Sequence, residues 1–137
     1  MKRPDDPDVG AWLVKASEDL AVVAVLRERA PHLDAAICFH CQQAAEKLLK
    51  AVLVAFGDVP PRTHDLAALV EEAAARLPAL ADLLADATYL SPFAVLPRYP
   101  VAPAPGIEAT VLVADAEARA RRIERAVLAL LTRPDGP

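Results

Sequence analysis

The chain has 137 residues, of which 55% are hydrophobic, 25% are charged and only 4% are aromatic. This length suits one domain with its own hydrophobic core, and the composition excludes disordered and collagen-like proteins. Fifteen basic and nineteen acidic residues give a net charge of −4, which argues against generic binding to a polyanion or to an anionic membrane. Any contact with nucleic acid must therefore be local.

The N-terminal segment lacks the apolar core of a secretory signal, and the apolar runs are far shorter than the roughly 18 residues that span a bilayer. We therefore expect a cytoplasmic protein with no membrane association. Cys38 and Cys41 lie in one predicted helix and are expected to be small, reduced core residues. Because no second pair of ligands accompanies them, the sequence predicts neither a metal site nor a cofactor.

Two long helices are predicted in the first half of the chain. Asp6 and Pro7 mark the start of the first, which runs to about Arg29. The second runs from about Leu33 to Gly57. Apolar residues recur at steps of three and four in both helices, which predicts one buried face on each. The expected buried face of the first helix is Val9, Trp12, Ala16, Leu20 and Val23. That of the second is Ile37, Cys41, Ala44, Leu48, Val52 and Ala55.

Prolines divide the second half of the chain. Thr63 would cap a third helix with Asp65 in its first turn, and Pro78 would kink this helix or split off a segment over residues 79–89. Five prolines between residues 91 and 106 predict an extended loop. A last helix is expected from about Ile107 to Leu131, with an apolar face of Val111, Ala114, Ala118, Ile123 and Val127.

These elements predict an all-α fold, an antiparallel up-and-down bundle of four to five helices. We expect the whole chain, residues 1–137, to form a single domain. Its core would span about residues 7–131, and residues 132–137 would form a frayed tail.

A polar stripe is predicted along the second helix, because His40, Gln43, Lys47 and Lys50 follow one another at steps of three and four. Lysine supplies positive charge and glutamine supplies both donors and acceptors, so the stripe suits a phosphate or a nucleobase. The alternative is a solvated helix face that carries one ion pair, between Glu46 and Lys50.

A second candidate site lies at the predicted start of the third helix. Arg62 and His64 place a cationic and a titratable side chain where a helix N-terminus favours an anion. The alternative is that Thr63 and Asp65 only cap the helix and that His64 packs on a neighbour.

Two further segments that contain arginine complete the set of candidates. Arg98 and Tyr99 lie between prolines in the predicted loop, where they could clamp a phosphate and stack a base, or equally anchor the loop to the bundle. The last helix contains a cluster of four arginines, Arg119, Arg121, Arg122 and Arg125. We interpret this cluster as a solvated helix face, with an ion pair between Glu117 and Arg121.

Several segments occur together in a characteristic order. They are Trp12 and the SEDL of residues 17–20, CFHCQQAAEKLLKA at residues 38–51, THDL at residues 63–66 and PRYP at residues 97–100. In this order they resemble the HEPN domain family over nearly the whole chain, and the stretch at residues 39–51 is the specific part. The resemblance implies an all-α bundle that forms homodimers, with the polar sites of two subunits facing a shared cleft. Relatives are often encoded beside a minimal nucleotidyltransferase and act as toxin and antitoxin pairs; some are metal-independent ribonucleases, and others are thought to bind nucleotides.

The ribonuclease branch of the family has an arginine followed, four to six residues later, by a histidine near the start of the last core helix. Arg98 matches this arginine, but no histidine follows His64 in the chain, so the motif is absent at the expected place. Arg27 and His32 have the right spacing at the end of the first helix, where about 0.7 matches would arise by chance.

The leading hypothesis is a homodimeric HEPN-type domain that binds a nucleotide or RNA phosphate and works with a minimal nucleotidyltransferase. One alternative is a ribonuclease in which His64 is the acid or base and Arg98 stabilises the developing charge. Another is a non-catalytic interaction module that has no ligand site. The predicted binding residues are His40, Gln43, Lys47, Lys50, Arg62, His64, Arg98 and Tyr99.

Overall fold

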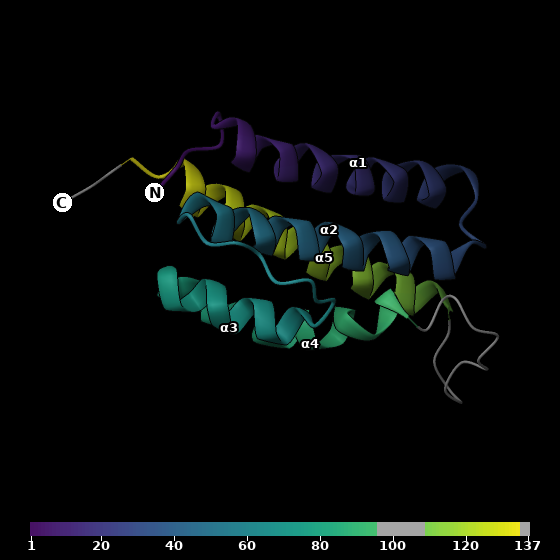
Figure 1. Cartoon of the computed structure of the whole chain (residues 1–137). Helices are drawn as coiled ribbons and strands as arrows, with labels where there is room; N and C mark the ends of the chain where they lie inside the picture. The colour runs from purple at the N-terminus through teal and green to yellow at the C-terminus, as the bar shows by residue number, and fades with distance from the viewer. Residues whose placement is uncertain (96–108, 135–137) are drawn as a thin grey trace.

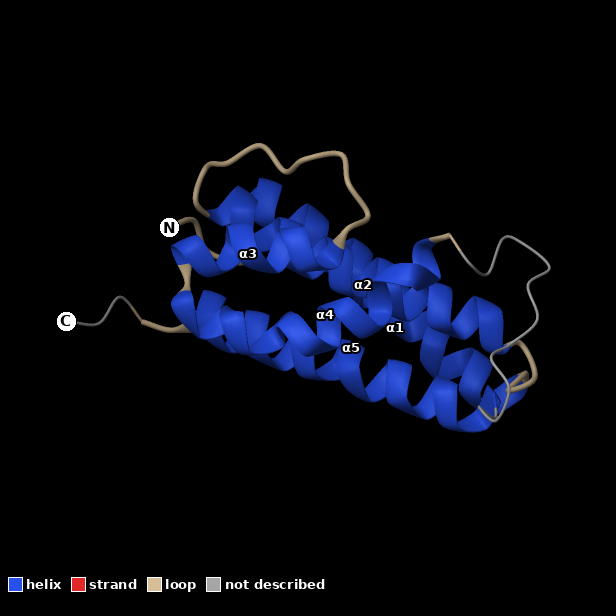
Figure 2. Ribbon diagram, turned by 90° about the horizontal axis from the view of Figure 1, so that it is seen from below, coloured by secondary structure: helices blue, strands red, loops and turns tan. Residues whose placement is uncertain are grey.

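The computed structural model describes residues 1–95 and 109–134, and all regular structure in these ranges is helical (Figure 2). The predicted all-α bundle is confirmed. The helix α2 is central, because it packs against α1, α3, α4 and α5 (Figure 1). The elements are α1 (Pro7–Arg29), α2 (Asp34–Ala55), α3 (Leu66–Arg76), the 3₁₀ helix η1 (Pro78–Leu83), α4 (Leu84–Leu90), the 3₁₀ helix η2 (Ser91–Ala94) and α5 (Ala109–Thr132).

The helices α1, α2, α4 and α5 alternate in direction, as expected of an up-and-down bundle (Figure 1). The helix α3 is an addition to this pattern, because it runs beside α2 in the same direction. Asp58, just after α2, pairs with Arg76 at the end of α3, while His64, just before α3, reaches Glu46 in the middle of α2. The connector of residues 56–65 therefore runs back along α2 before α3 begins.

The ends of the first two helices follow their local sequence. The Asp6 carboxylate accepts hydrogen bonds from the backbone N–H groups of Asp8 and Val9, as predicted for a cap. After α2, Gly57 has a φ of 82° in the left-handed region, which glycine adopts without steric cost. Its N–H donates to Val54, and this bond helps to close the end of the helix.

Two boundaries in the second half differ from the predictions, and a third follows one of two predicted alternatives. The helix α3 begins at Leu66, because Asp65 rather than Thr63 is its cap and accepts from the Ala68 N–H at 3.2 Å. Pro78 starts η1, where the chain reverses direction (Figure 1), so the predicted split into a separate segment is confirmed and the alternative of a kink is not. Pro92 occupies the first turn of η2, where an extended loop was predicted. Most of that loop lies outside the described residues.

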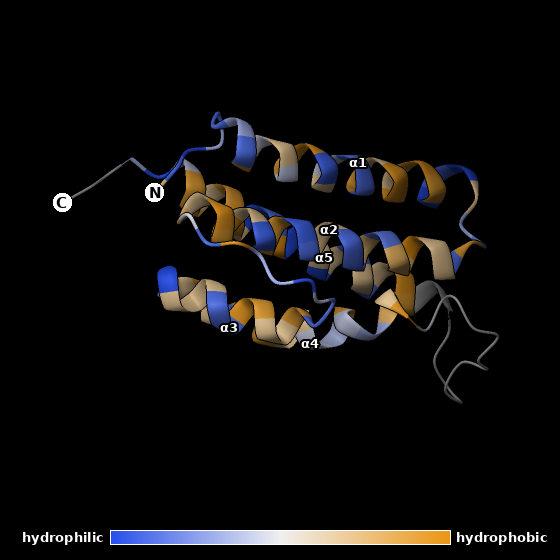
Figure 3. Ribbon diagram, viewed as in Figure 1, coloured by the Kyte–Doolittle hydropathy of each residue, from blue (hydrophilic) through white to orange (hydrophobic). Residues whose placement is uncertain are grey.

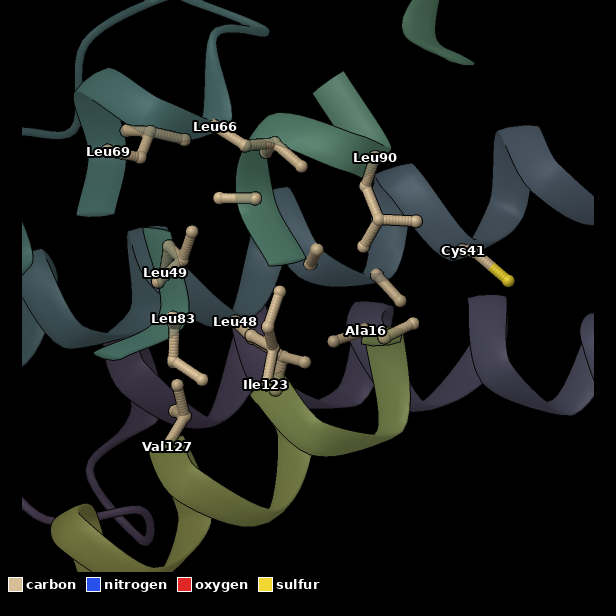
Figure 4. Close-up of a cluster of buried hydrophobic side chains, with 14 of the residues drawn as sticks. Ala16, Cys41, Leu48, Leu49, Leu66, Leu69, Leu83, Leu90, Ile123 and Val127 are labelled. Atoms are coloured by element: carbon tan, nitrogen blue, oxygen red, sulfur yellow. The ribbon is translucent and has the colours of Figure 1, made fainter. Parts of the chain in front are cut away.

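The core combines side chains from every helix, and the predicted faces of the first two helices are confirmed apart from Trp12, which is half-buried (Figure 4). The predicted face of the last helix is wrong in part, because Ala114 and Ala118 are exposed. Alanine is small enough for either environment, so its spacing does not mark the buried side. The buried residues of α5 are Val113, Ala116, Ala120, Ile123, Val127, Leu130 and Leu131.

A buried carboxylate joins α4 to α5. Asp86 is 2% exposed and accepts from Arg119 at 3.2 Å and from Arg122 at 2.5 Å. The Arg119 guanidinium also lies 4.4 Å from the centre of the Tyr89 ring. These two arginines are therefore structural, which corrects their interpretation as part of a solvated face.

The expected pair between Glu117 and Arg121 is likewise replaced. Glu117 lies 3.7 Å from Arg27 of α1, and Arg121 pairs with Glu124 at 3.4 Å. Glu117 thus joins α5 to α1 instead of stabilising its own helix. No helix in the described ranges has both the length and the apolar character needed to cross a membrane.

Replacing Asp86 by alanine should lower the free energy of unfolding by about 1–3 kcal/mol, because two arginines lose a buried acceptor. Urea denaturation measures this loss. Asp82→Ala at an exposed position nearby is the matched control and should change stability by less than about 0.5 kcal/mol. Equal effects of the two substitutions would contradict a structural role for Asp86.

Both cysteines are core residues, as predicted, with exposed fractions of 1% for Cys38 and 0% for Cys41. Burial raises the pKa of Cys38 from 9.0 to about 12, and the Asp34 carboxylate adds to the rise. Burial also raises the pKa of Cys41 from 9.0 to about 12, with smaller contributions from Cys38 and Glu117. Both thiols therefore resist ionisation in the folded state.

This resistance predicts a loss of stability at alkaline pH. Below about pH 9 the thiols are protonated in both states; above it the unfolded thiols lose protons that the folded thiols retain, so unfolding becomes more favourable. Between about pH 9 and 12 the pair should lower the free energy of unfolding by up to roughly 3 kcal/mol per pH unit. Urea denaturation across this range should show a shallower dependence for the double variant C38A/C41A, and identical slopes would refute the assignment.

Candidate functional site

The candidate site centres on the polar face of α2, which we define as His40, Gln42, Gln43, Glu46, Lys47 and Lys50. Figure 3 shows hydrophilic segments along α2 between α1 and the connector that leads to α3. Gln42 is 0% exposed, Glu46 5% and Lys50 7%. The predicted ion pair between Glu46 and Lys50 is confirmed at 3.1 Å, but the alternative of a solvated face is wrong because much of this face is buried.

Asp19 of α1 organises one end of the polar face. Its Oδ1 lies 2.9 Å from Nδ1 of His40, and its Oδ2 accepts from Nζ of Lys47 at 2.5 Å. Asp19 is nearly buried, whereas 29% of the His40 side chain and 23% of the Lys47 side chain remain exposed. One carboxylate of α1 thus holds a lysine and an imidazole of α2 at the edge of solvent.

Glu46 organises the other end in the same way. Its Oε2 accepts from Nζ of Lys50, and its Oε1 lies 2.7 Å from Nδ1 of His64. The Gln42 amide also donates to Oε1, at 3.3 Å. Glu46 is buried, but 63% of the His64 side chain is exposed. Here the carboxylate belongs to α2, and the imidazole comes from the connector.

The backbone of His64 is also held by hydrogen bonds. Its carbonyl oxygen accepts from the Gln42 amide at 3.4 Å and from the Ser91 hydroxyl at 3.2 Å. The same hydroxyl accepts from the Leu66 N–H at 3.1 Å, so η2 connects the start of α3 to the connector. These contacts fix the position from which the His64 ring projects. The alternative that His64 packs on a neighbour is correct for Nδ1, which contacts Glu46. The His64 side chain is nevertheless 63% exposed.

The charges of the polar face largely cancel. Lys47 and Lys50 are each paired with a buried or nearly buried carboxylate, and Gln43 donates to Gln42 at 2.7 Å. Each lysine therefore stabilises an acidic group before it can attract an anion. Lys50 also lies 5.8 Å from the centre of the Trp12 ring, within range of a cation–π contact. With neutral imidazoles, these two cations and two anions sum to zero.

The remaining predicted site residues differ in their surroundings. Arg62 is exposed and makes no ion pair within the described ranges, so its charge is open to solvent. The N-terminus of α3, however, is less open to an anion than expected. Its first N–H groups already donate to Ser91 and to the Asp65 carboxylate. Arg98 and Tyr99 lie outside the described residues.

A hollow of about 440 Å³ adjoins the polar face at the first turns of α2. It is lined in part by His32, Phe39 and His40, and the Phe39 ring meets the His40 ring edge-on at a centroid distance of 5.4 Å. This volume lies within the range of pockets that hold small ligands, about 300–1,000 Å³. His40 therefore faces both Asp19 and an open hollow.

The sequence pattern did not identify the two carboxylates, Asp19 and Glu46, as parts of the site. Asp19 lies three residues after Ala16 and four before Val23, so it falls on the buried side of its helix. A charged residue at such a position requires a partner, and this was the available signal. Glu46 was recognised only as half of an ion pair. Nothing in the sequence indicated that His64, 18 residues further on, would reach it. Within the described ranges, no group of three or more His, Cys, Asp or Glu side chains is arranged to hold a metal ion.

Comparison with known proteins places this geometry in a family. A family profile described as the HEPN domain matches residues 9–128. The chain belongs to the HEPN family. Among solved structures, an archaeal HEPN homologue shares 26% sequence identity with this HEPN domain and superposes with a TM-score of 0.67. That similarity covers 96% of this chain and 100% of the homologue. No curated protein matches the chain significantly.

The carboxylate of Asp19 should be a main source of stability for this end of the HEPN domain. Asp19→Ala removes the partner of His40 and Lys47 and should lower the free energy of unfolding by about 1–3 kcal/mol. The neighbouring exposed residue gives a control, since Glu18→Ala removes only a surface pair with Lys15 and should cost about 0.5 kcal/mol or less. Chemical denaturation compares the two variants. A loss no larger for Asp19→Ala than for Glu18→Ala would show that the buried network contributes little.

Proposed function

We propose that this HEPN domain binds a phosphate-bearing ligand, a nucleotide or RNA, on the polar face of α2. The observation that carries the proposal is the exposed imidazole of His64, which a buried carboxylate orients through Nδ1 while 63% of the side chain remains exposed. A ring held in this way is ready to contact a ligand without losing further side-chain freedom. His40, oriented by Asp19, provides a second imidazole beside a hollow of suitable size.

The charge balance assigns different roles to the cationic residues. In this proposal, Lys47 and Lys50 keep Asp19 and Glu46 in place, and Arg62 supplies the charge that attracts phosphate. Gln43 adds polar contacts on the floor of the site. Arg98 and Tyr99 are proposed to complete the site from the proline-rich segment, as an anion clamp and a base-stacking ring.

The partners proposed for this HEPN domain follow from its family. We propose that the single domain forms a homodimer and acts with a minimal nucleotidyltransferase, as toxin and antitoxin. Membership of the family, shown by the match over residues 9–128, supports this proposal.

A second candidate function is cleavage of RNA. It is favoured by one observation, because a carboxylate-oriented imidazole has the arrangement of a general base or acid. Arg98 would then stabilise the charge that develops on the phosphate. Loss of intact RNA during incubation with the purified protein would favour this candidate over simple binding.

Isothermal titration calorimetry at low salt tests the proposed binding, with ATP in one arm and a short RNA in the other. Heat that saturates at up to millimolar ligand is expected in at least one arm. Arg62→Ala should weaken binding about 5- to 10-fold, because it removes a charge from the site. Arg125→Ala provides the matched control, since it removes an exposed arginine from the outer side of α5. It should leave the affinity unchanged.

The absence of heat in both arms would overturn the proposal and leave the non-catalytic interaction module as the better description. An equal weakening by Arg62→Ala and Arg125→Ala would also contradict it. That result would mean that overall charge, rather than a local site, attracts the ligand.

A further inference from the structure

The two histidines of the site share one arrangement. In each case a carboxylate with at most 10% of its side chain exposed contacts Nδ1 of the ring through one oxygen and a lysine ammonium through the other. One set consists of Asp19, His40 and Lys47, and the other of Glu46, His64 and Lys50. Both lysines lie on α2, but one carboxylate belongs to α1 and the other to α2, and one imidazole belongs to α2 and the other to the connector. The similarity is therefore not a consequence of one repeated segment.

The lysines determine the state of the carboxylates. A nearly buried carboxylate that accepts from an ammonium group is ionised, because a protonated acid would leave the ammonium without an opposite charge. An ionised carboxylate has no hydrogen to donate. The short contacts of 2.9 Å at His40 and 2.7 Å at His64 must then use a hydrogen carried by the ring nitrogen Nδ1.

The other neighbours of the Glu46 carboxylate point the same way. The Gln42 amide and the Lys50 ammonium both donate to it, so every polar group that contacts Glu46 in the described ranges is a donor. At Asp19 the contacts come from Lys47 and His40. Among the described residues, no hydrogen-bond acceptor that would favour protonation contacts either carboxylate.

We propose that Glu46 and Asp19 are positioning residues that hold His64 and His40 in the Nδ1–H tautomer. Each ring then presents Nε2 as its free nitrogen. A neutral ring accepts a hydrogen bond there from a ligand hydroxyl, whereas a protonated ring donates there to a phosphate oxygen. Both modes use the same atom of each ring, so the protonation state selects which part of a nucleotide is bound.

This inference rests on the proposed function only where it says what Nε2 would contact in a ligand. The tautomer itself is a property of the free protein. Long-range ¹H–¹⁵N NMR correlation spectra distinguish a ring nitrogen that carries hydrogen from one that does not. They should be recorded on the whole chain without ligand at about pH 8.5, where imidazoles are largely neutral. We expect hydrogen on Nδ1 and a bare Nε2 for His40 and His64. Exposed His32, which lies just before α2, serves as the unconstrained reference.

Two conservative variants identify the carboxylates as the cause. In Glu46→Gln the new amide should direct its oxygen to the Lys50 ammonium and its NH₂ group to His64. The ring must then accept at Nδ1, and its hydrogen should move to Nε2. Asp19→Asn should have the same effect on His40. Each variant is the matched control for the other, because it should leave the second histidine unchanged.

Hydrogen on Nε2 of His64 or His40 in the wild-type protein would overturn the assignment for that ring. An unchanged His64 tautomer in a folded Glu46→Gln variant would remove the positioning role of Glu46. Because no ligand is present in these spectra, a failure of the proposed nucleotide or RNA binding would not alter the outcome. The two proposals can therefore fail separately.

Discussion

The structure depends on one constraint: the central helix α2 carries both the core and the polar face of the protein. Because α2 packs against α1, α3, α4 and α5, its charged side chains cannot all reach water. The cost of burying Glu46 and Lys50 is offset by pairing them with each other, and Lys47 finds Asp19 on α1. The polar residues of α2 therefore hold neighbouring elements in place while they shape the site.

Pairing inside the protein also determines what remains for a ligand. Once the lysines pair with the carboxylates, Arg62 and the His64 imidazole are the exposed groups among the described site residues, and the His40 side chain is 29% exposed. Under the proposed function, a chain with a net charge of −4 would thus present a local anion site without a broad basic surface. The pairing also makes the histidines, rather than the lysines, the groups through which the HEPN domain would contact a nucleotide or RNA.

The path of the connector creates half of this arrangement. Residues 56–65 run back along α2, so His64 reaches the middle of the helix and not its end (Figure 1). Ser91 and Gln42 then hold the His64 backbone, and the Leu66 N–H at the start of α3 donates to the same serine. The additional helix α3 thus has a clear structural consequence, because it anchors the segment that carries an exposed histidine.

The sequence by itself determined the helices, the buried faces of α1 and α2, the cysteines of the core and the family, because these follow from local spacing and from one specific stretch at residues 39–51. It did not reveal the buried side of α5, since alanine fits both environments, nor the pairing of Asp86 with two arginines. Only the tertiary structure decided which charges are neutralised. Asp19 and Lys47 are 28 residues apart, and Glu46 and His64 are 18 apart, so their contacts arise from the packing of separate elements and not from any local pattern.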